Sequence, residues 1–310
     1  MVTVNCLTFN HAPYIKDTMD GFCLQQTSFP FVCLILDDAS TDGEQEVIRQ
    51  YMEEHFDLEN EGVARTEDTD DYHLIFARHK ANANCHFAAF LLKYNHHHKK
   101  DKGRYTMEWK KQARYNATCD GDDYWTHPQK LQRQFDLMEA HPEYSLCFHA
   151  SNKLMPTGEM ETYRPNPIKE CYTPEEAIWH GGNLMATCSM FHRWKDQLKE
   201  GRPDFMRECP IGDLPLMLFH AAKGPIGYID EVMSVYRFFA VGSWSASQNT
   251  LKKRLRHYHA IMKMYDQYDA YTHQRFHDAI VRKKQRISKG QRIDNVKSLA
   301  RWILERLHLR

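Results

Sequence analysis

The residues best suited to chemistry are three carboxylates within four positions, Asp120, Asp122 and Asp123, in the stretch CDGDDYW. Carboxylates this close repel one another unless a cation shares them, and oxygen ligands on a turn suit Mg²⁺ or Mn²⁺. Such ions usually also take phosphate oxygens from a substrate. The alternative is a solvated acidic turn. The position of the carboxylates between an expected strand and an expected helix argues against this alternative.

A second polar cluster, Asp37–Asp42, directly follows an apolar run of six residues. A carboxylate at the end of a strand can accept a hydrogen bond from a base or a ribose. The alternative is that Ser40, Thr41 or Asp42 only caps the next helix. Both interpretations can hold for different residues of the cluster.

These clusters need elements that bring them together, and the first half of the chain alternates strand-like and helix-like segments. Strands are expected at Val2–Leu7, Phe31–Leu36, His73–Ala77 and Tyr115–Cys119. Repeated strand–helix units imply a mostly parallel α/β sheet with helices on both faces, in which ligands bind at the carboxyl ends of the strands. The clusters at Thr8–His11, Asp37–Asp42 and Asp120–Asp123 would then lie along one edge of the sheet.

The connections are less regular. A helix is expected from the third strand to about Tyr94, a solvated acidic connection at Asp57–Asp71, and a polar, basic insertion at His96–Arg114. In the second half, the expected strands are Tyr144–His149, Ala186–Phe191, Ile226–Ile229 and Val232–Phe238, and Gly212–Ala222 is an expected helix. We therefore predict a catalytic domain over residues 1–247 and a helical, basic extension over residues 248–310.

Composition excludes several classes of protein. The 310 residues carry 41 basic and 41 acidic side chains, which argues against a generic nucleic-acid binder. No apolar run approaches the roughly 20 residues of a membrane span, and no secretory signal is visible. Nine scattered cysteines without a CxxC pair favour a reducing compartment. Neither GxGxxG nor GxxxxGK[ST] occurs, so the phosphate chemistry is not that of a Rossmann dehydrogenase or a P-loop enzyme.

Several motifs in sequence order resemble family 2 glycosyltransferases, which have the GT-A fold. The resemblance runs from about Val2 to Trp244 and rests on the order and spacing of motifs that are weak singly. They are Thr8-Phe9-Asn10-His11, Asp37–Asp42, Asp120-Gly121-Asp122-Asp123-Tyr124-Trp125, Lys130-Leu131, Gly212-Asp213-Leu214-Pro215-Leu216, Gly227–Val232 and Val235-Tyr236-Arg237.

The resemblance implies a role for each matching residue. Thr8, Phe9 and Asn10 would lie at the nucleotide, and Asp38 would contact the base. Asp120 would approach the ribose or the metal, and Asp122 would hold the divalent cation, Mn²⁺ or Mg²⁺. Arg237 and the loop Phe238–Ser247 would cover the diphosphate.

Asp213 would be the general base, because the acceptor hydroxyl has a high pKa and must lose its proton as the new bond forms. In-line attack with such a base inverts the anomeric centre. A helix N-cap is the alternative for Asp213, and Glu208 and Glu231 are competing bases. The acidic residue that often precedes the base is Gly212 here, and the missing Q-x-x-R-W motif favours addition of a single sugar.

The predicted function is inverting, metal-dependent transfer of one hexosyl or N-acetylhexosaminyl group from a nucleotide sugar, with a UDP-sugar as the expected donor. The acceptor would be a hydroxyl in surface-polysaccharide or lipid-linked glycan synthesis. Two alternatives stay open: a sugar-phosphate nucleotidyltransferase, and a non-catalytic glycan-binding protein on a degenerate transferase fold.

The C-terminal tail carries a second hypothesis. Ten basic and two acidic residues between Arg282 and Arg310 give a local charge of +8. Apolar residues recur there at three- and four-residue spacing, which predicts an amphipathic helix. We expect a cytoplasmic protein with peripheral contact at the inner face of the plasma membrane. Alternatively, the apolar stripe packs on the catalytic domain or on a second copy of the chain.

Overall fold

The apolar run at 31–36 forms the buried strand β2 (Phe31–Asp37), every residue of which is shielded from solvent. In the computed structural model, which describes residues 1–96, 102–240 and 250–291, β2 lies between two parallel neighbours. These are β1 (Val2–Thr8) and β5 (Cys85–Leu92). A strand paired on both sides and covered on both faces needs apolar side chains throughout, which is what the sequence supplies.

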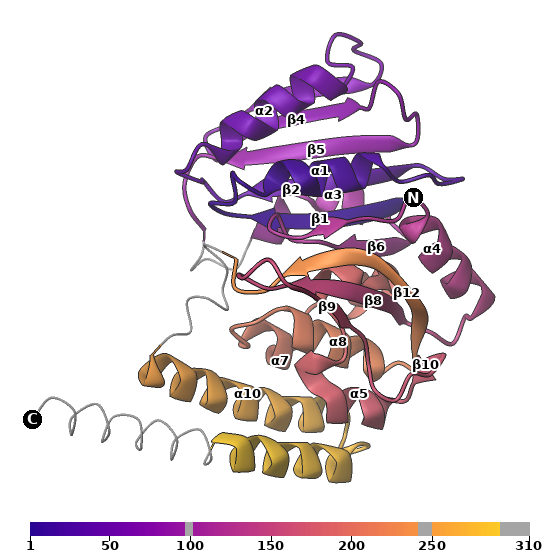
Figure 1. The fold of residues 1–310 in the computed structure, drawn as a ribbon, viewed down its shortest axis with the longest axis vertical. Coiled ribbons are helices and arrows are strands. Elements are labelled where there is room, and N and C mark those ends of the chain that lie inside the picture. Colours follow the sequence, from indigo (N-terminus) through magenta and orange to yellow (C-terminus); the bar gives the residue numbers. More distant parts are fainter. Residues whose placement is uncertain (97–101, 241–249, 292–310) are drawn as a thin grey trace, which may run out of the picture.

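The described residues form one twelve-stranded sheet that runs from β10 at one edge to β3 at the other (Figure 1). The order is β10-β12-β8-β11-β6-β1-β2-β5-β4-β3, with β7 paired to β12 and β9 to β8. Pairings among β1, β2, β5 and β6, and between β8 and β12, are parallel, and the rest are antiparallel. The remaining strands are β3 (Ala64–Asp68), β4 (Tyr72–Arg78), β6 (Tyr115–Thr118), β7 (Tyr124–Trp125), β8 (Leu146–Leu154), β9 (Met160–Tyr163), β10 (Cys171–Tyr172), β11 (Phe191–Arg193) and β12 (Ile226–Arg237).

Helices cover both faces of the N-terminal half of the sheet. On one face, the helices α1 (Ile15–Cys23), α2 (Glu44–His55) and α4 (Lys130–Ala140) share a core with β1, β2 and β5. On the other face, Trp109 of the short helix α3 (Met107–Lys110) packs with Leu34 and Phe90. This arrangement leaves the carboxyl ends of β1, β2 and β6 as the edge where the loops meet.

A separate core fills the C-terminal half. It joins the sheet to a set of helices and to the helical segment 277–291, which lies beside α10 in Figure 1. Ile261, Tyr265 and Ile280 of the last two helices are buried in this core, which also contains Leu218 of α8. The helices of this half are α5 (Pro174–His180), α6 (Trp194–Glu200), α7 (Asp204–Arg207), α8 (Asp213–Ala221) and α10 (Leu251–Tyr271), with the 3-10 turns η2 (Gly181–Asn183) and η3 (Thr187–Ser189). A further 3-10 turn, η1 (Lys102–Arg104), precedes α3 in the N-terminal half.

The helix expected up to Tyr94 is wrong, because residues 85–92 form the strand β5. The continuous apolar run fits a buried helix and a buried strand equally well by periodicity. Strand pairing determines which of the two structures the run adopts, since β5 lies between β2 and β4 and forms backbone hydrogen bonds with both.

Three smaller differences follow from tertiary pairing. The acidic connection contains β3, which pairs with β4 at the sheet edge. The two short strands expected around residue 230 are one strand, β12, whose pairing with β8 is interrupted by register shifts. The strand expected at Ala186–Phe191 is mostly the turn η3, and β11 begins at Phe191.

No helix within the described ranges is long and apolar enough to cross a membrane.

Candidate functional site

The three polar clusters meet at one edge of the sheet, as predicted. The Asp38 amide donates to the Thr8 carbonyl at 3.0 Å, and the Gly121 amide donates to the Leu7 carbonyl at 3.0 Å. These two bonds fasten the loops after β2 and β6 to the end of β1. Side chains from three distant parts of the sequence therefore share one surface.

Thr8 is buried and holds this surface together rather than facing solvent. Its hydroxyl donates to the carboxylate of Glu44 and lies 3.1 Å from His11 Nδ1. Glu44 also accepts from the His11 amide at 2.9 Å and from the Ser40 hydroxyl at 2.8 Å. Burial raises the pKa of Glu44 to about 7, against these hydrogen bonds, which lower it. A Cβ at Gly121 would lie 2.0 Å from the Thr8 hydroxyl, so only glycine fits there.

Asn10 joins the first two loops. Its backbone has φ of 58°, a left-handed conformation that asparagine tolerates. Its Oδ1 accepts from the Thr41 amide at 2.8 Å, and its own amide donates to Ser40 Oγ at 2.9 Å. The neighbouring Phe9 is 40% exposed, so its ring is the side chain of this loop that is free to contact a ligand.

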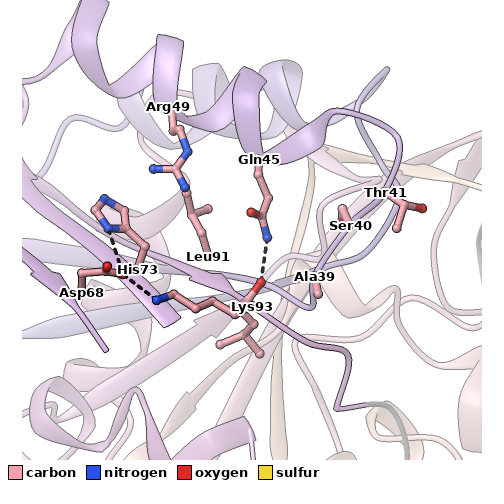
Figure 2. A pocket seen from close by; sticks show the side chains of 10 residues that line it. Ala39, Ser40, Thr41, Gln45, Arg49, Asp68, His73, Leu91 and Lys93 are labelled. Atoms are coloured by element: carbon pink, nitrogen blue, oxygen red, sulfur yellow. Dashed lines mark hydrogen bonds and ion pairs between the residues drawn. The ribbon is translucent and has the colours of Figure 1, made fainter. Parts of the chain in front are cut away.

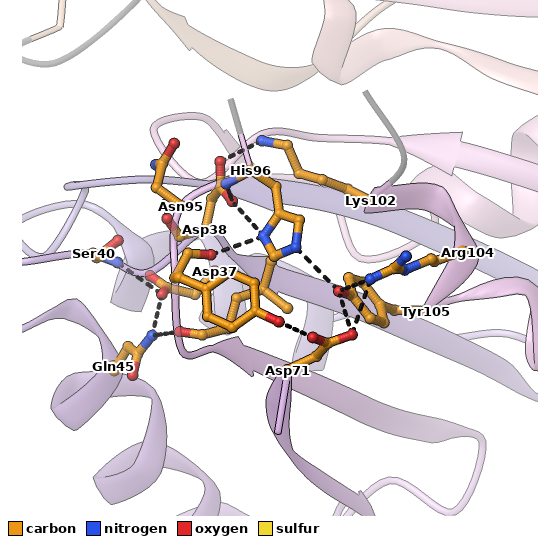
Figure 3. Close-up of polar contacts among 12 residues, drawn as sticks. Asp37, Asp38, Ser40, Gln45, Asp71, Asn95, His96, Lys102, Arg104 and Tyr105 are labelled. Atoms are coloured by element: carbon orange, nitrogen blue, oxygen red, sulfur yellow. Dashed lines mark hydrogen bonds and ion pairs between the residues drawn. The ribbon is translucent and has the colours of Figure 1, made fainter. Parts of the chain in front are cut away.

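Asp38 is buried, and both of its carboxylate oxygens have partners (Figure 3). Oδ1 accepts from the His96 amide at 2.7 Å, and Oδ2 accepts from Lys102 Nζ at 2.6 Å. The Asn95 side chain donates to the Asp38 carbonyl at 2.9 Å. Since each carboxylate oxygen can accept a second hydrogen bond, Asp38 can still contact a base, but its charge is already paired.

Sequence reasoning missed Asn95, His96 and Lys102. Asn95 follows the end of β5, and His96 and Lys102 belong to the stretch treated as an insertion, which the structure folds back onto Asp38. Residues 97–101 lie outside the described ranges. Polar side chains that closely follow a buried strand are a signal that could have found Asn95 and His96, but the mistaken helix concealed it.

The acidic cluster separates into two parts. The Arg237 amide donates to Asp123 Oδ1 at 2.8 Å, so Asp123 is engaged within the protein. Burial, together with the negative charges of Asp122 and Asp213, raises the pKa of Asp120 to about 7. Asp122 Oδ2 lies 3.9 Å from His11 Nε2. Asp120, Asp122 and Asp213 therefore share one electrostatic environment with an excess of negative charge.

This donor set fits a divalent cation. Its ligands would be carboxylate oxygens, as Mg²⁺ and Mn²⁺ prefer, and their mutual repulsion is what a cation relieves. Within the described ranges, no three His, Cys, Asp or Glu side chains are arranged to hold a metal ion by themselves. A cation held by two carboxylates and by phosphate oxygens of a bound donor would fit both the repulsion among the carboxylates and the lack of a third protein ligand. Mg²⁺ is commonly held in this way, by one or two carboxylates and a substrate phosphate.

Asp213 is the first residue of α8 and follows the N-cap residue Gly212. Burial raises its pKa, while hydrogen bonds from backbone amides and the charge of His257 oppose the rise. Its own charge helps to raise the pKa of Tyr163 to about 12, after burial. Asp213 of α8 therefore lies close enough to Tyr163 of β9 and His257 of α10 for their charges to interact, and sequence reasoning had not identified Tyr163 or His257.

The two competing bases are held elsewhere. Glu208 forms an ion pair with Lys263 at 2.7 Å, and Glu231 contacts Arg133 and lies 3.3 Å from His127. The carboxylates whose charges chiefly raise the pKa of Asp120 are instead Asp122 and Asp213. Asp213 is the candidate base that shares the environment of the acidic cluster.

Arg237 lies beside the acidic cluster, with its guanidinium donating to the Asp122 carbonyl at 2.8 Å and pairing with Asp17. The guanidinium also lies over the rings of Tyr14 and Tyr124, at 5.0 and 4.4 Å from their centroids. Most of the loop predicted to cover the diphosphate, residues 241–247, lies outside the described ranges.

Comparison with known proteins gives relatives of the sequence and of the fold. No protein-family model matches the chain. Uncharacterized protein Rv1520 of Mycobacterium tuberculosis and uncharacterized protein Mb1547 of Mycobacterium bovis are each 27% identical over 252 residues. The match covers 81% of this chain and 63% of each relative, so the chain spans less than two thirds of their length.

Two solved structures share the fold. S. aureus TarS 1–349 in complex with UDP-GlcNAc aligns with a TM-score of 0.52 at 13% identity, over 94% of this chain and 92% of that one. Mannosyltransferase PcManGT from Pyrobaculum calidifontis, in complex with GDP-Man and Mn²⁺, aligns with a TM-score of 0.52 at 13% identity, over 99% and 80%. The chain therefore has the α/β fold of glycosyltransferases, as the sequence predicted.

Proposed function

We propose that the chain is a glycosyltransferase that moves one sugar from a nucleotide-sugar donor to a hydroxyl acceptor, with a divalent cation and with inversion at the anomeric carbon. The observation that carries the proposal is the shared environment of Asp120, Asp122 and Asp213 beside the loops at Thr8–His11 and Asp37–Asp42. The fold, which is that of proteins solved with UDP-GlcNAc and with GDP-Man and Mn²⁺, supports it.

In the proposed mechanism the nucleotide lies over the first two loops. Phe9 offers an exposed ring against the base, and Asp38 offers its remaining lone pairs to the base edge. Asp120 and Asp122 would hold Mn²⁺ or Mg²⁺, which neutralises charge on the leaving diphosphate. Arg237, next to Asp122, would add a fixed positive charge on the same side.

Asp213 would act from the acceptor side. Its raised pKa makes it a stronger base than an exposed aspartate, and its place in α8 separates it in sequence from the metal-binding carboxylates. It would take the proton from the acceptor hydroxyl while the hydroxyl attacks the anomeric carbon. A UDP-hexose or a UDP-N-acetylhexosamine is the proposed donor, and a surface polysaccharide or lipid-linked glycan the proposed acceptor.

A donor panel tests this proposal. The purified chain is incubated with UDP-, GDP- and dTDP-sugars with Mn²⁺, and release of nucleoside diphosphate is measured. We expect release from one class of donor, loss of release in EDTA, and recovery when Mn²⁺ is restored. Manganese-dependent binding of UDP without release from any donor, with and without a mixed glycan acceptor pool, would instead favour a glycan-binding protein.

The variant Asp122→Ala tests the proposed metal site directly. The variant should lose turnover and metal-dependent nucleotide binding while it keeps the wild-type unfolding midpoint, because Asp122 makes few stabilising contacts. Asp136→Ala, which removes an exposed carboxylate from α4, is the matched control and should leave turnover unchanged. Wild-type turnover in Asp122→Ala would reject the proposed metal site.

A further inference from the structure

A polar groove of about 520 Å³ opens between α2 and the ends of β4 and β5 (Figure 2), and Asp120, Asp122 and Asp213 are not part of its lining. Leu91 forms part of its floor, and the loop after β2 closes one end. The polar side chains that the argument uses are Thr41, Gln45, Arg49, Asp68, His73 and Lys93. Its volume lies within the range of sites that bind small molecules.

The groove carries an excess of positive charge. Asp68 is the acidic residue in its lining, and it already pairs with Lys93 at 2.9 Å and lies 3.7 Å from His73. Arg49 extends from α2 toward the sheet on the same side as His73 (Figure 2) and makes no hydrogen bond or ion pair with any described residue. A half-buried guanidinium without a carboxylate partner is suited to a phosphate or carboxylate, which it can bind through two parallel hydrogen bonds.

The other end of the groove presents groups that suit hydroxyls. The Gln45 amide nitrogen donates to Asp37 and to the Leu92 carbonyl, which fixes the side chain and leaves its oxygen as an acceptor. Thr41 lines the same end of the groove, and its hydroxyl donates to Asn10 Oδ1 at 3.4 Å and can still accept a hydrogen bond. A fixed acceptor and a hydroxyl, a short distance along the groove from an unpaired cation, match the polar groups of an acidic sugar.

We propose that this groove is a second ligand site, which binds a sugar bearing a phosphate or carboxylate group. It goes beyond the proposed transferase function and does not depend on it. The groove shares the loop 39–41 with the donor side, because the Thr41 amide donates to Asn10 and the Ser40 amide donates to Asp37. A ligand here therefore touches the segment that positions Asp38.

Direct binding tests the proposal. Saturation-transfer NMR titrations of the full chain use glucose 6-phosphate, glucuronate, glucose and inorganic phosphate as separate probes. We expect at least one acidic sugar to bind about tenfold or more tighter than glucose and than inorganic phosphate. The acidic sugar that binds more tightly, glucose 6-phosphate or glucuronate, shows whether the groove prefers a phosphate or a carboxylate. Failure of both acidic sugars, or equal binding of glucose or of inorganic phosphate, overturns the proposal.

Variants assign the binding to the groove. Arg49→Gln should weaken the acidic probe roughly ten- to a hundredfold, the usual worth of a hydrogen bond to a charged group. Lys93→Gln is a second variant that should also weaken it. Arg65→Gln removes an arginine of β3 that pairs with Glu108, outside the groove, and serves as the control. Unchanged binding in both groove variants rejects the site.

A final titration separates this site from the donor site. The acidic probe should remain bound when UDP and Mn²⁺ are saturating, because the groove and the carboxylate cluster involve different side chains. Complete displacement of the probe by UDP would mean that it occupies the donor site and would overturn the proposal. Since none of these measurements uses turnover, an inactive protein leaves the result interpretable.

Discussion

Asp213 is half-buried, burial raises its pKa, and its charge acts on Asp120 of the acidic cluster. Asp213→Asn keeps the shape of the side chain but cannot accept a proton. We expect turnover to fall by about 10²-fold or more, in line with general-base contributions, with donor binding nearly unchanged. Steady-state kinetics and UDP titration measure the two effects separately.

The control for this change is Asp204→Asn, which alters an exposed aspartate in the same position of a helix, the first residue of α7. It should retain wild-type turnover. If Asp213→Asn is active while Glu208→Gln or Glu231→Gln is inactive, the base has been assigned to the wrong carboxylate.

Lys130 is a buried amine that should lower the free energy of unfolding by a measurable amount. It is fully shielded from solvent, its Nζ lies 3.7 Å from the centre of the Trp125 ring, and it has no hydrogen-bond partner among the described residues. Burial lowers its pKa to about 7, from the usual 10.5. The unfolded chain therefore binds more protons between pH 7 and 10.5, so this lysine destabilises the fold most at and below pH 7.

We expect Lys130→Met to raise the free energy of unfolding at pH 7 by ~1–4 kcal/mol, as replacement of buried charges by apolar groups often does. The gain should shrink as the pH rises toward 10. Urea unfolding at pH 7 and pH 9.5 measures both. Lys110→Met is the matched contrast, because Lys110 donates to Asn5 at 2.7 Å and its loss should destabilise the protein. A less stable Lys130→Met would show that the amine has a partner that matters.

The sequence correctly predicted the helices and strands for which the hydrophobic periodicity and the flanking residues indicate the same type of element. β1, β2 and α8 lie where expected, and the strand ends bring together the predicted polar clusters. The strand β5 was missed because its apolar run has no period that distinguishes strand from helix. The contact of Lys102 with Asp38 spans 64 positions and depends on how β5 pairs, so no local pattern could indicate it. The groove beside Arg49 arises from the same pairing.

The contact between β11 and α8 gives the fold a sensitivity to acid. His192 and His220 are buried with ring centres 4.6 Å apart. Burial lowers the pKa of His192 to about 3 and that of His220 well below its ordinary value. In the unfolded chain both would titrate near 6.5. The unfolded state therefore binds more protons between about pH 3 and 6.5, and stability falls as the pH drops through that window.

His220→Leu tests this. Neither ring nitrogen of His220 has a hydrogen-bond partner in the described structure, so the change should cost little at pH 7. It should reduce the dependence of unfolding free energy on pH, between pH 6 and 4.5, by up to about 1.4 kcal/mol per pH unit. Urea unfolding across this range measures the slope. His259→Leu, on an exposed position of α10, should leave the slope unchanged, and an unchanged slope in His220→Leu would contradict the argument.

The C-terminal helices pack in the same hydrophobic core as α8. Buried residues of α10 and of 277–291 enter the core of the second half. Three of the ten basic residues between Arg282 and Arg310 contact other parts of the described structure. Lys283 donates to the Trp179 and His180 carbonyls at 2.8 and 3.1 Å, Lys284 pairs with Asp266, and Arg286 lies over the Trp179 ring. The packing alternative therefore applies to residues 282–291.

The membrane hypothesis remains a prediction for residues 292–310, which lie outside the described ranges. Their sequence carries five basic and two acidic residues with apolar residues at helical spacing. We expect the full chain to sediment with phosphatidylglycerol vesicles at low salt, and a chain ending at Gln291 to stay in solution. Each basic residue near an anionic surface contributes roughly 1 kcal/mol, a contribution that salt screens. Binding should therefore weaken from 50 to 300 mM NaCl and be absent with phosphatidylcholine alone. Sedimentation of the shortened chain, or none of the full chain, would reject the membrane role and leave packing on this domain or on a second copy as the function of the apolar stripe.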